Sequence, residues 1–351
     1  MTTVASRVTR AERKDWARER FLGAECSLLP SFKPGTADLD EEGVRHDVRL
    51  GIRQGFYSMF CAGIGLKQED RRRFVEIAVD EAGEQMLIST GAGARSSVAV
   101  ASESLREAQS TGVSHVMFGL PSGPDARTED EIYAFAREVI DSTDLGIVLY
   151  AQRGEQFRHI HPGNVPLGVY ERLAELPNVV GVKITQVLDA VTTYELCDRV
   201  GEKLLLGPVN LEHLPFIASV CPVQCTMMWQ VDACQAPEQP YVVDYLKLLA
   251  QGRIDEAVGV YRRMEPLVQL FWDEQAAVLR EGGHPWAHLK YHTWCVGGNG
   301  GFLPEAAGGH DLPPLTGEDR QRIREAYARC GITPRGPEAE FDAGRVSFGR
   351  G

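Results

Sequence analysis

Two side chains able to carry out Schiff-base chemistry stand at the ends of short apolar runs. Lys183 ends the run 176–183, and Tyr150 ends the run 145–150. The run before Lys183 is β-branched and uncharged, which is typical of a buried parallel strand. Burial disfavours the ammonium form and leaves a neutral amine that can attack a carbonyl carbon. A neighbouring phenol would supply the proton donor that such an attack requires.

Each of the two residues also has a structural explanation. A lysine at a strand end can extend to water or to an acidic neighbour. A tyrosine at a strand end commonly packs its ring and leaves its hydroxyl in water. On position alone the structural explanation of Lys183 is the stronger one. The pair favours chemistry only if the fold makes the two strands neighbours.

The chain pattern predicts an α/β fold of eight strands that alternate with helices. The predicted strands cover approximately 21–30, 55–60, 85–90, 112–118, 145–150, 179–183, 203–207 and 223–228. The helices between them are predicted near 38–54, 68–82, 96–110, 128–141, 165–175, 187–200 and 211–220. Such alternation implies right-handed crossovers and a parallel sheet. Eight units within about 200 residues favour a (β/α)8 TIM barrel.

The segments outside the alternating region complete the predicted organisation. We expect an N-terminal leader at 1–20, partly helical and packed outside the main fold, followed by the barrel at 21–236. The pattern of 237–330 is helical only and predicts a C-terminal helical domain, with helices near 239–251, 253–281, 284–296 and 316–330. The Gly/Pro-rich tail 331–351 is expected to have little order.

An open, doubly wound sheet is the alternative fold. A dinucleotide-binding glycine motif would support it. Two glycine-rich segments of the chain are candidates for such a motif. The segment 91–93 lacks the third glycine and the acidic residue downstream, and the segment 297–301 follows a helix rather than a strand. Both segments are therefore better explained as turns.

The barrel prediction places the chemistry at the carboxyl ends of the strands. Tyr150 and Lys183 end the fifth and sixth predicted strands, so they are expected to be neighbours on one rim. Other groups predicted at this rim are Cys61–Gly63, Thr90–Gly93, Pro121–Gly123, Gly207 and Thr226. Because a phenol is expected beside Lys183, a chemical role for this lysine is favoured over the structural explanation.

These motifs resemble the dihydrodipicolinate synthase / N-acetylneuraminate lyase superfamily of class I Schiff-base, pyruvate-type aldolases. The resemblance covers approximately residues 20–305 and is carried by 147–150, 176–183, 206–207 and 297–301. It implies a TIM barrel with a C-terminal helical domain, no cofactor, and a homotetramer or homodimer. It also implies that Lys183 forms an imine with pyruvate or a related 2-oxo acid and that Tyr150 is the acid/base.

The sequence departs from that family at the turn after the second strand. The family carries a hydroxyl-containing turn that binds the keto-acid carboxylate and relays protons, whereas this chain has Cys61, Ala62 and Gly63. The N–H groups of Ala62 and Gly63 are predicted to bind a carboxylate as an anion nest, without a hydroxyl relay. The remaining predicted substrate-binding residues are Arg153, Gly207, Cys225 and Thr226.

These departures favour a diverged member over an enzyme of lysine synthesis. An aldolase or hydratase-aldolase with an aldehyde as second substrate is expected, and a sugar-acid dehydratase with the same imine chemistry is the alternative. A non-catalytic barrel that has lost the carboxylate-binding turn is a rival from another class. A metal-dependent lyase is a third possibility.

Charge and hydropathy exclude several other classes. The formal net charge of −12 disfavours a nucleic-acid partner, which requires a basic face. Residues 1–19 do not have the pattern of a signal peptide, and no run approaches the eighteen or so apolar residues of a membrane span. A small-molecule substrate and a cytoplasmic location are expected.

Possible metal ligands have better structural explanations. Cys221, Cys225 and Cys234 form the only cysteine cluster but lack a second ligand pair at zinc-site spacing, so core packing is expected. His284, His288 and His292 lie on one helical face. No carboxylate that would orient them is evident, and a surface or interface helix is expected. We therefore predict no metal site.

Overall fold

We describe the protein from a computed structural model. The structure describes residues 8–92, 97–121, 128–185, 189–228, 230–279, 284–304 and 315–348. Gly93 and the residues Ser122 and Gly123, which were predicted at the barrel rim, lie outside the described residues.

Eight parallel strands carry the fold. They are β1 (Gly23–Leu28), β2 (Ser58–Cys61), β3 (Leu87–Ala92), β4 (His115–Gly119), β5 (Gly146–Ala151), β6 (Val179–Ile184), β7 (Leu205–Pro208) and β8 (Cys225–Thr226). Their order in the sheet is β7-β6-β5-β4-β3-β2-β1-β8. Every one of them falls within or next to a predicted strand. The fold is a (β/α)8 TIM barrel with a C-terminal helical extension, which confirms the predicted class.

The helices follow the strands as expected. They are α1 (Arg13–Arg20), α2 (Glu41–Arg53), α3 (Gln68–Ala82), α4 (Val98–Ser110), α5 (Glu129–Ile140), α6 (Leu167–Leu173), α7 (Ala190–Val200), α8 (Leu214–Val220), α9 (Tyr241–Ala250), α10 (Ile254–Leu279), α11 (Trp286–Cys295), α12 (Gly317–Arg329) and α13 (Glu338–Ala343). Among these described helices, none is long and apolar enough to cross a membrane.

Side chains at the predicted starting points fix several of these helices. The Asp40 carboxylate accepts the N–H of Gly43 at the start of α2, and the Asp189 carboxylate accepts the N–H of Thr192 at the start of α7. Thr128 forms a reciprocal capping box at the start of α5. Such caps satisfy N–H groups that the first helical turn leaves without a partner.

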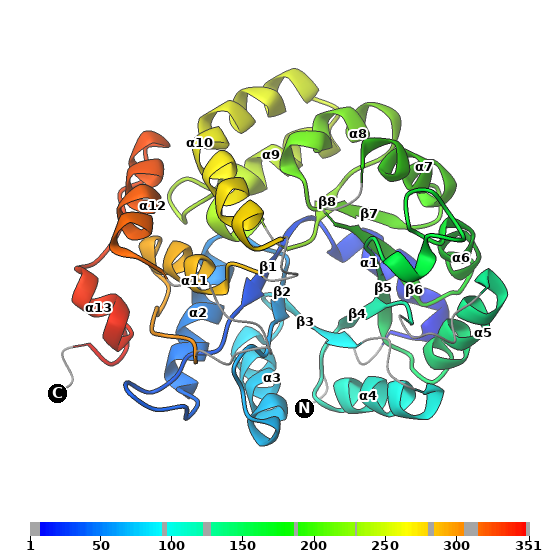
Figure 1. Ribbon diagram of the computed structural model, residues 1–351, viewed down its shortest axis with the longest axis horizontal. Helices are drawn as coiled ribbons and strands as arrows, with labels where there is room; N and C mark the ends of the chain where they lie inside the picture. Colours follow the sequence, from blue (N-terminus) through cyan, green and yellow to red (C-terminus); the bar gives the residue numbers. More distant parts are fainter. Residues whose placement is uncertain are drawn as a thin grey trace. The chain divides into compact units, whose positions relative to one another are not determined.

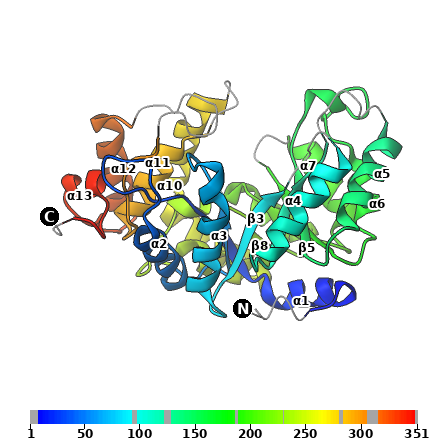
Figure 2. The ribbon, with the colours of Figure 1, turned by 90° about the horizontal axis from the view of Figure 1, so that it is seen from below.

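The chain forms two compact units. The first comprises residues 1–24, 87–227 and 246–254, and the second comprises 25–86, 228–245 and 255–351. In the first unit, α4 to α8 surround the outer side of the strands β4 to β8 (Figure 1). In the second unit, α2 lies beside α11 (Figure 1 and Figure 2). The predicted division at residues 236 and 237 into barrel and helical domain stays a prediction.

The described part of the predicted leader, residues 8–20, packs within the first unit. Arg13 and Trp16 of α1 are buried. The Arg13 Nε donates to the Asp144 carbonyl at 2.7 Å, and Arg10 donates to the Asn178 side chain at 3.0 Å. Trp16 contacts Phe21 edge to face, with 5.5 Å between ring centroids. These contacts attach α1 to loops that precede the strands, so the basic residues of the leader bind the barrel itself.

The expectation of a poorly ordered tail was wrong for residues 331–348. Helix α13 forms there, and its Phe341 is buried against Tyr291 and Trp294 with centroid distances of 5.0 and 5.6 Å. The N–H of Val346 donates to the Asn299 side chain at 3.0 Å. The buried Phe341 and the hydrogen bond of Val346 both attach this segment to the helical part.

Lys290 of α11 is buried in the second unit and contacts the chain just after β1. The Lys290 ammonium donates to the Pro30 carbonyl and, at 3.4 Å, to the Ser31 hydroxyl. Burial lowers the pKa of Lys290 to about 8, against the opposing attraction of Asp47. Burial raises the pKa of Asp47, and the charge of Lys290 acts against that shift. The pair therefore has a structural function in which each charge compensates the other.

Replacing Lys290 should show this compensation. We expect Lys290→Met to lower the free energy of unfolding in urea by about 3 kcal/mol, because Asp47 loses its compensating charge. The double variant Lys290→Met/Asp47→Asn should be more stable than Lys290→Met alone. The exposed Lys247→Met is the matched control, with an effect within about 0.5 kcal/mol. A double variant less stable than the single one would contradict the pairing.

Candidate active site

Lys183 and Tyr150 are neighbours, as the sequence predicted. They are register partners in β6 and β5, and the Lys183 Nζ lies 5.1 Å from the centroid of the Tyr150 ring. All six residues of β6 are buried, and Lys183 is only 4 % exposed. Register partners in adjacent parallel strands direct their side chains to the same face of a sheet. The amine and the phenol therefore share one face at the carboxyl ends of the two strands.

Tyr150 is placed and tuned by its surroundings. The Tyr170 hydroxyl, on α6, donates to the Tyr150 carbonyl at 2.9 Å and holds the end of β5. Burial raises the pKa of Tyr150 to about 12, because the phenolate form loses its hydration in a buried place. The phenol therefore stays protonated at neutral pH and can act as a proton donor.

Gly207 completes the row at β7 and leaves room for a methionine. It is the register partner of Lys183 on the side opposite Tyr150. A Cβ at Gly207 would lie 2.8 Å from the Sδ of Met227 and 2.9 Å from its Cγ. Such distances are shorter than carbon contacts allow, so glycine is required here for Met227 to take its place. Sequence reasoning identified Gly207 but missed Met227.

Cys225 and Thr226 are held by β7. The Thr226 hydroxyl donates to the Pro208 carbonyl, and the Cys225 thiol contacts the Leu206 carbonyl at 3.7 Å. Both residues are buried. Their side-chain polar atoms thus connect β8 to β7 within the first unit. The predicted role of these two residues in substrate binding stays a prediction.

Arg153 lies in the loop after β5 and is exposed. The pKa of Asp189 is lowered mainly by the N–H of Thr192, which donates to its carboxylate at 2.9 Å. The charge of Arg153 lowers this pKa further and is the smallest of the causes. Arg153 follows β5, which carries Tyr150, and Asp189 follows β6, which carries Lys183. The two charged residues therefore lie in the loops after the two strands of the candidate site. The predicted contact of Arg153 with a substrate stays a prediction.

The turn predicted to bind a carboxylate lies in the second unit. Cys61 ends β2 and is buried, and burial, followed by the charge of Glu25, raises the pKa of its thiol. The N–H of Ala62 donates to the Leu28 carbonyl at 3.0 Å. One of the two predicted donors is therefore engaged with β1. The anion-binding prediction now depends on the N–H of Gly63.

Four buried acidic or hydroxyl side chains of the second unit, those of Glu25, Ser27, Ser58 and Asp232, were missed. The Asp232 carboxylate accepts the N–H and the hydroxyl of Ser27 at 2.6 and 2.9 Å. The Ser58 hydroxyl donates to the Glu25 carboxylate at 3.0 Å. The signal for Glu25 was present in the sequence, since it is a lone charge in an apolar strand, as Lys183 is.

The histidine prediction was wrong in part. Helix α11 buries both His288 and His292 instead of presenting them on a surface. The His292 Nε2 contacts the Glu274 carboxylate at 3.0 Å, and its Nδ1 contacts the Tyr327 hydroxyl at 3.2 Å. Glu274 is thus the carboxylate partner that the sequence did not reveal. Within the described ranges, no group of three or more possible ligands is placed to hold a metal ion.

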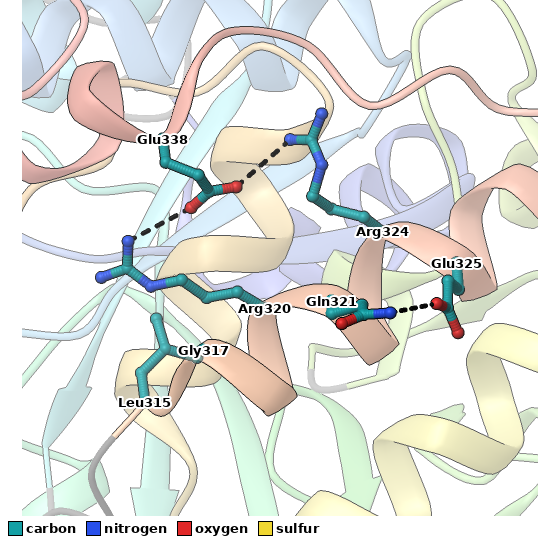
Figure 3. A pocket seen from close by; sticks show the side chains of 7 residues that line it. All are labelled: Leu315, Gly317, Arg320, Gln321, Arg324, Glu325 and Glu338. Carbon is teal, nitrogen blue, oxygen red and sulfur yellow. Dashed lines mark hydrogen bonds and ion pairs between the residues drawn. The ribbon is translucent and has the colours of Figure 1, made fainter.

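A groove of about 580 Å³ is present in the second unit (Figure 3). Figure 3 shows Arg320 and Arg324 of α12 turned toward Glu338, at 3.2 and 3.7 Å. Gln321 donates to Glu325 at 2.8 Å along the same helix. The residues that line this groove include no lysine, so it does not supply Schiff-base chemistry.

The fold is a (β/α)8 barrel with a buried lysine beside a tyrosine at the carboxyl ends of two adjacent strands. Residues 21–206, more than half of the chain, match the model of the Dihydrodipicolinate synthetase family. The chain therefore belongs to that family.

Individual relatives agree with this assignment. The chain is 30% identical over 182 residues to 4-hydroxy-tetrahydrodipicolinate synthase of Methylobacterium radiotolerans, which covers 49% of this chain and 57% of that protein. It is 29% identical over 173 residues to a probable 5-dehydro-4-deoxyglucarate dehydratase of Bacillus subtilis, covering 46% and 52%. The matches thus span little more than half the length of these curated relatives.

A solved structure covers more of the chain. YagE of Escherichia coli K12, a family member solved in complex with pyruvate, superposes with a TM-score of 0.67 at 18% identity. The match covers 89% of this chain and 99% of that one. At this identity the likeness establishes the fold.

The close contact between Gly207 and Met227 gives a stability prediction. We expect Gly207→Ala to lower the free energy of unfolding by about 1–3 kcal/mol, because the new Cβ overlaps the Met227 thioether. Gly119→Ala is the matched control, since a Cβ there meets no atom within 4 Å at the end of β4. Urea denaturation measures both. Equal effects of the two substitutions would contradict the proposed overlap.

Proposed function

We propose that the protein is a Schiff-base-forming lyase, an aldolase or hydratase-aldolase, that acts on pyruvate or a related 2-oxo acid. The observation that carries the proposal is the buried Lys183, 5.1 Å from the Tyr150 ring on the adjacent strand. Membership of a family that contains synthases and a dehydratase supports lyase chemistry in general. The roles of the individual residues are our proposal.

The chemistry follows from the two groups. The neutral Lys183 amine attacks the C2 carbonyl carbon, and the carbinolamine loses water with a proton supplied by the Tyr150 phenol. The resulting iminium withdraws electrons from C3, so the Tyr150 phenolate left by the dehydration step can take a C3 proton, which restores the phenol and forms an enamine. The enamine then adds to an aldehyde, and the reverse sequence cleaves a C–C bond. Each step uses only groups of this chain and the substrates, and no cofactor is needed.

Carboxylate binding by the turn Cys61–Gly63, with the Gly63 N–H as a donor, stays a prediction. Because this turn has no hydroxyl, the proton relay of the family's turn is lost, and Tyr150 acts without it. A sugar-acid dehydratase is the alternative function. The similarity to the dehydratase of Bacillus subtilis supports it, since dehydration uses the same imine.

We further propose a homotetramer or homodimer located in the cytoplasm. The resemblance to the family supports an oligomer, and the formal charge of −12 supports a small-molecule rather than a nucleic-acid partner. Size-exclusion chromatography with light scattering measures the oligomeric state.

Borohydride trapping tests the imine directly. We expect pyruvate and borohydride to add one reduced pyruvate unit to the peptide that contains Lys183. Lys290 is an internal control, because it is also buried but already donates to Pro30 and Ser31. Lys183→Ala should abolish the adduct and leave the fold intact by circular dichroism.

Two outcomes would overturn the proposal in different ways. No adduct with any 2-oxo acid, and no thermal stabilisation by these acids, would favour a non-catalytic barrel. Activity that survives Lys183→Ala but is lost with a chelator would indicate a metal-dependent lyase.

The role of Tyr150 predicts a specific pH dependence. Exchange of the pyruvate methyl protons in D2O, followed by NMR, reports enamine formation without a second substrate. We expect Tyr150→Phe to slow this exchange by about 10²-fold or more. Because the pKa of Tyr150 is raised to about 12, the phenol keeps its proton between pH 7 and 10. The ratio of the wild-type and variant rates should therefore stay constant over that interval; a ratio that collapses near pH 10 would contradict the shift.

A further inference from the structure

We propose that Tyr170 is a positioning residue, whose hydroxyl fixes the end of β5 and thereby the direction of the Tyr150 phenol. The inference rests on the proposed function and adds to it a residue of α6, which lies outside the row of Tyr150, Lys183 and Gly207. It concerns only residues of the first unit, all of them described.

The contact joins a buried side chain to the main chain of the candidate site. The Tyr170 hydroxyl donates to the Tyr150 carbonyl at 2.9 Å, and Tyr170 is only 1 % exposed. A hydroxyl buried to this extent cannot exchange its acceptor for water, so the hydrogen bond is costly to break. Burial also raises the pKa of Tyr170, so its phenol keeps the proton that it donates.

The carbonyl that receives this hydrogen bond lies where the sheet ceases to hold β5 from one side. Tyr150 pairs with Gly119 of β4, and among the described residues the pairing of β4 with β5 ends there. The Tyr170 hydroxyl thus restricts the peptide plane that follows Tyr150. A change at that plane alters the angle ψ of Tyr150 and with it the direction of the Cα–Cβ bond. The ring, whose centroid is 5.1 Å from the Lys183 Nζ, would move with that bond.

Helix α6 is itself held where it carries Tyr170. The Glu129 carboxylate, at the start of α5, accepts the N–H of Gly168 at 3.0 Å. A Cβ at Gly168 would lie 2.5 Å from this carboxylate, so a larger residue would displace it. The Arg172 guanidinium adds a second contact with α5, 3.8 Å from the centroid of the Tyr133 ring. A helix of seven residues has little stability of its own. Its contacts with α5 therefore help to determine where the Tyr170 hydroxyl lies.

A positioning role has a specific kinetic consequence. Proton transfer requires the phenol oxygen within hydrogen-bond reach of the reacting atoms, and a displacement of about 1 Å can slow a reaction by roughly 10²-fold. Because the Tyr170 hydroxyl is engaged with a backbone carbonyl, it acts through Tyr150 and not on the substrate. Its loss should therefore lower the rate of proton transfer at saturating substrate and leave the substrate concentration at half-saturation unchanged.

The test measures exchange of the pyruvate methyl protons in D2O by NMR. We expect Tyr170→Phe to slow the exchange at saturating pyruvate about tenfold and to keep the concentration at half-saturation within about twofold. Tyr133→Phe is the matched control, because it removes a tyrosine hydroxyl from α5 and keeps the ring that contacts Arg172. Its exchange rate should equal that of the wild type.

A second comparison separates positioning from a general loss of structure. In a Tyr150→Phe protein the phenol that Tyr170 positions is absent, so adding Tyr170→Phe should change the remaining rate by less than about twofold. Higher protein concentration makes this slow exchange measurable. Slowing by the same factor with and without the Tyr150 phenol would show a structural effect only and would overturn the inference.

Gly168→Ala covers the case in which Tyr170→Phe does not fold by circular dichroism. It displaces the Glu129 carboxylate from α6 and should slow exchange by a smaller factor, again only when the Tyr150 phenol is present. A wild-type rate in folded Tyr170→Phe or, failing that variant, in folded Gly168→Ala would overturn this inference alone. A wild-type protein that neither exchanges pyruvate protons nor forms an adduct at Lys183 would overturn the proposed function together with it.

Discussion

The parallel register of β5, β6 and β7 is the constraint on which the candidate site depends. It places Tyr150, Lys183 and Gly207 in one row, with the amine between a ring and a glycine. Parallel pairing is set by backbone hydrogen bonds, and a slip of one residue would turn Lys183 to the opposite face. The buried, continuous apolar run of β6 makes such a slip costly, because it would exchange a whole set of packed side chains.

The row also explains why small residues recur beside the lysine. Gly181 and Gly207 provide the space that Met227 fills, and the anchoring of β8 on β7 holds Met227 there. Packing at near-crystalline density means that the shape of one strand determines which residue another strand can carry. Gly207 of β7 has no side chain, and Met227, which follows β8, fills the space that a side chain there would take.

Two buried lysines show how surroundings separate chemistry from structure. Lys290 faces a backbone carbonyl, a hydroxyl and the carboxylate of Asp47, which together satisfy an ammonium. Lys183 has the Tyr150 ring beside it. The acceptors around Lys290 give that ammonium a structural role, whereas the phenol beside Lys183 is a proton donor of the kind that attack on a carbonyl requires.

The sequence by itself determined the eight strands, the helices between them and the pairing of Tyr150 with Lys183. These follow from local periodicity and from the rule that successive strands in an alternating α/β chain lie side by side. Only the tertiary structure showed that Met227 fills the space beside Gly207, that Glu274 accompanies His292, and that the Ala62 N–H already donates to the Leu28 carbonyl. These partners are 18 to 34 residues apart in sequence, and which atoms meet across such separations depends on packing volumes that no local pattern contains. The order of the tail after residue 331 was decided in the same way, by the burial of Phe341 against side chains from α11.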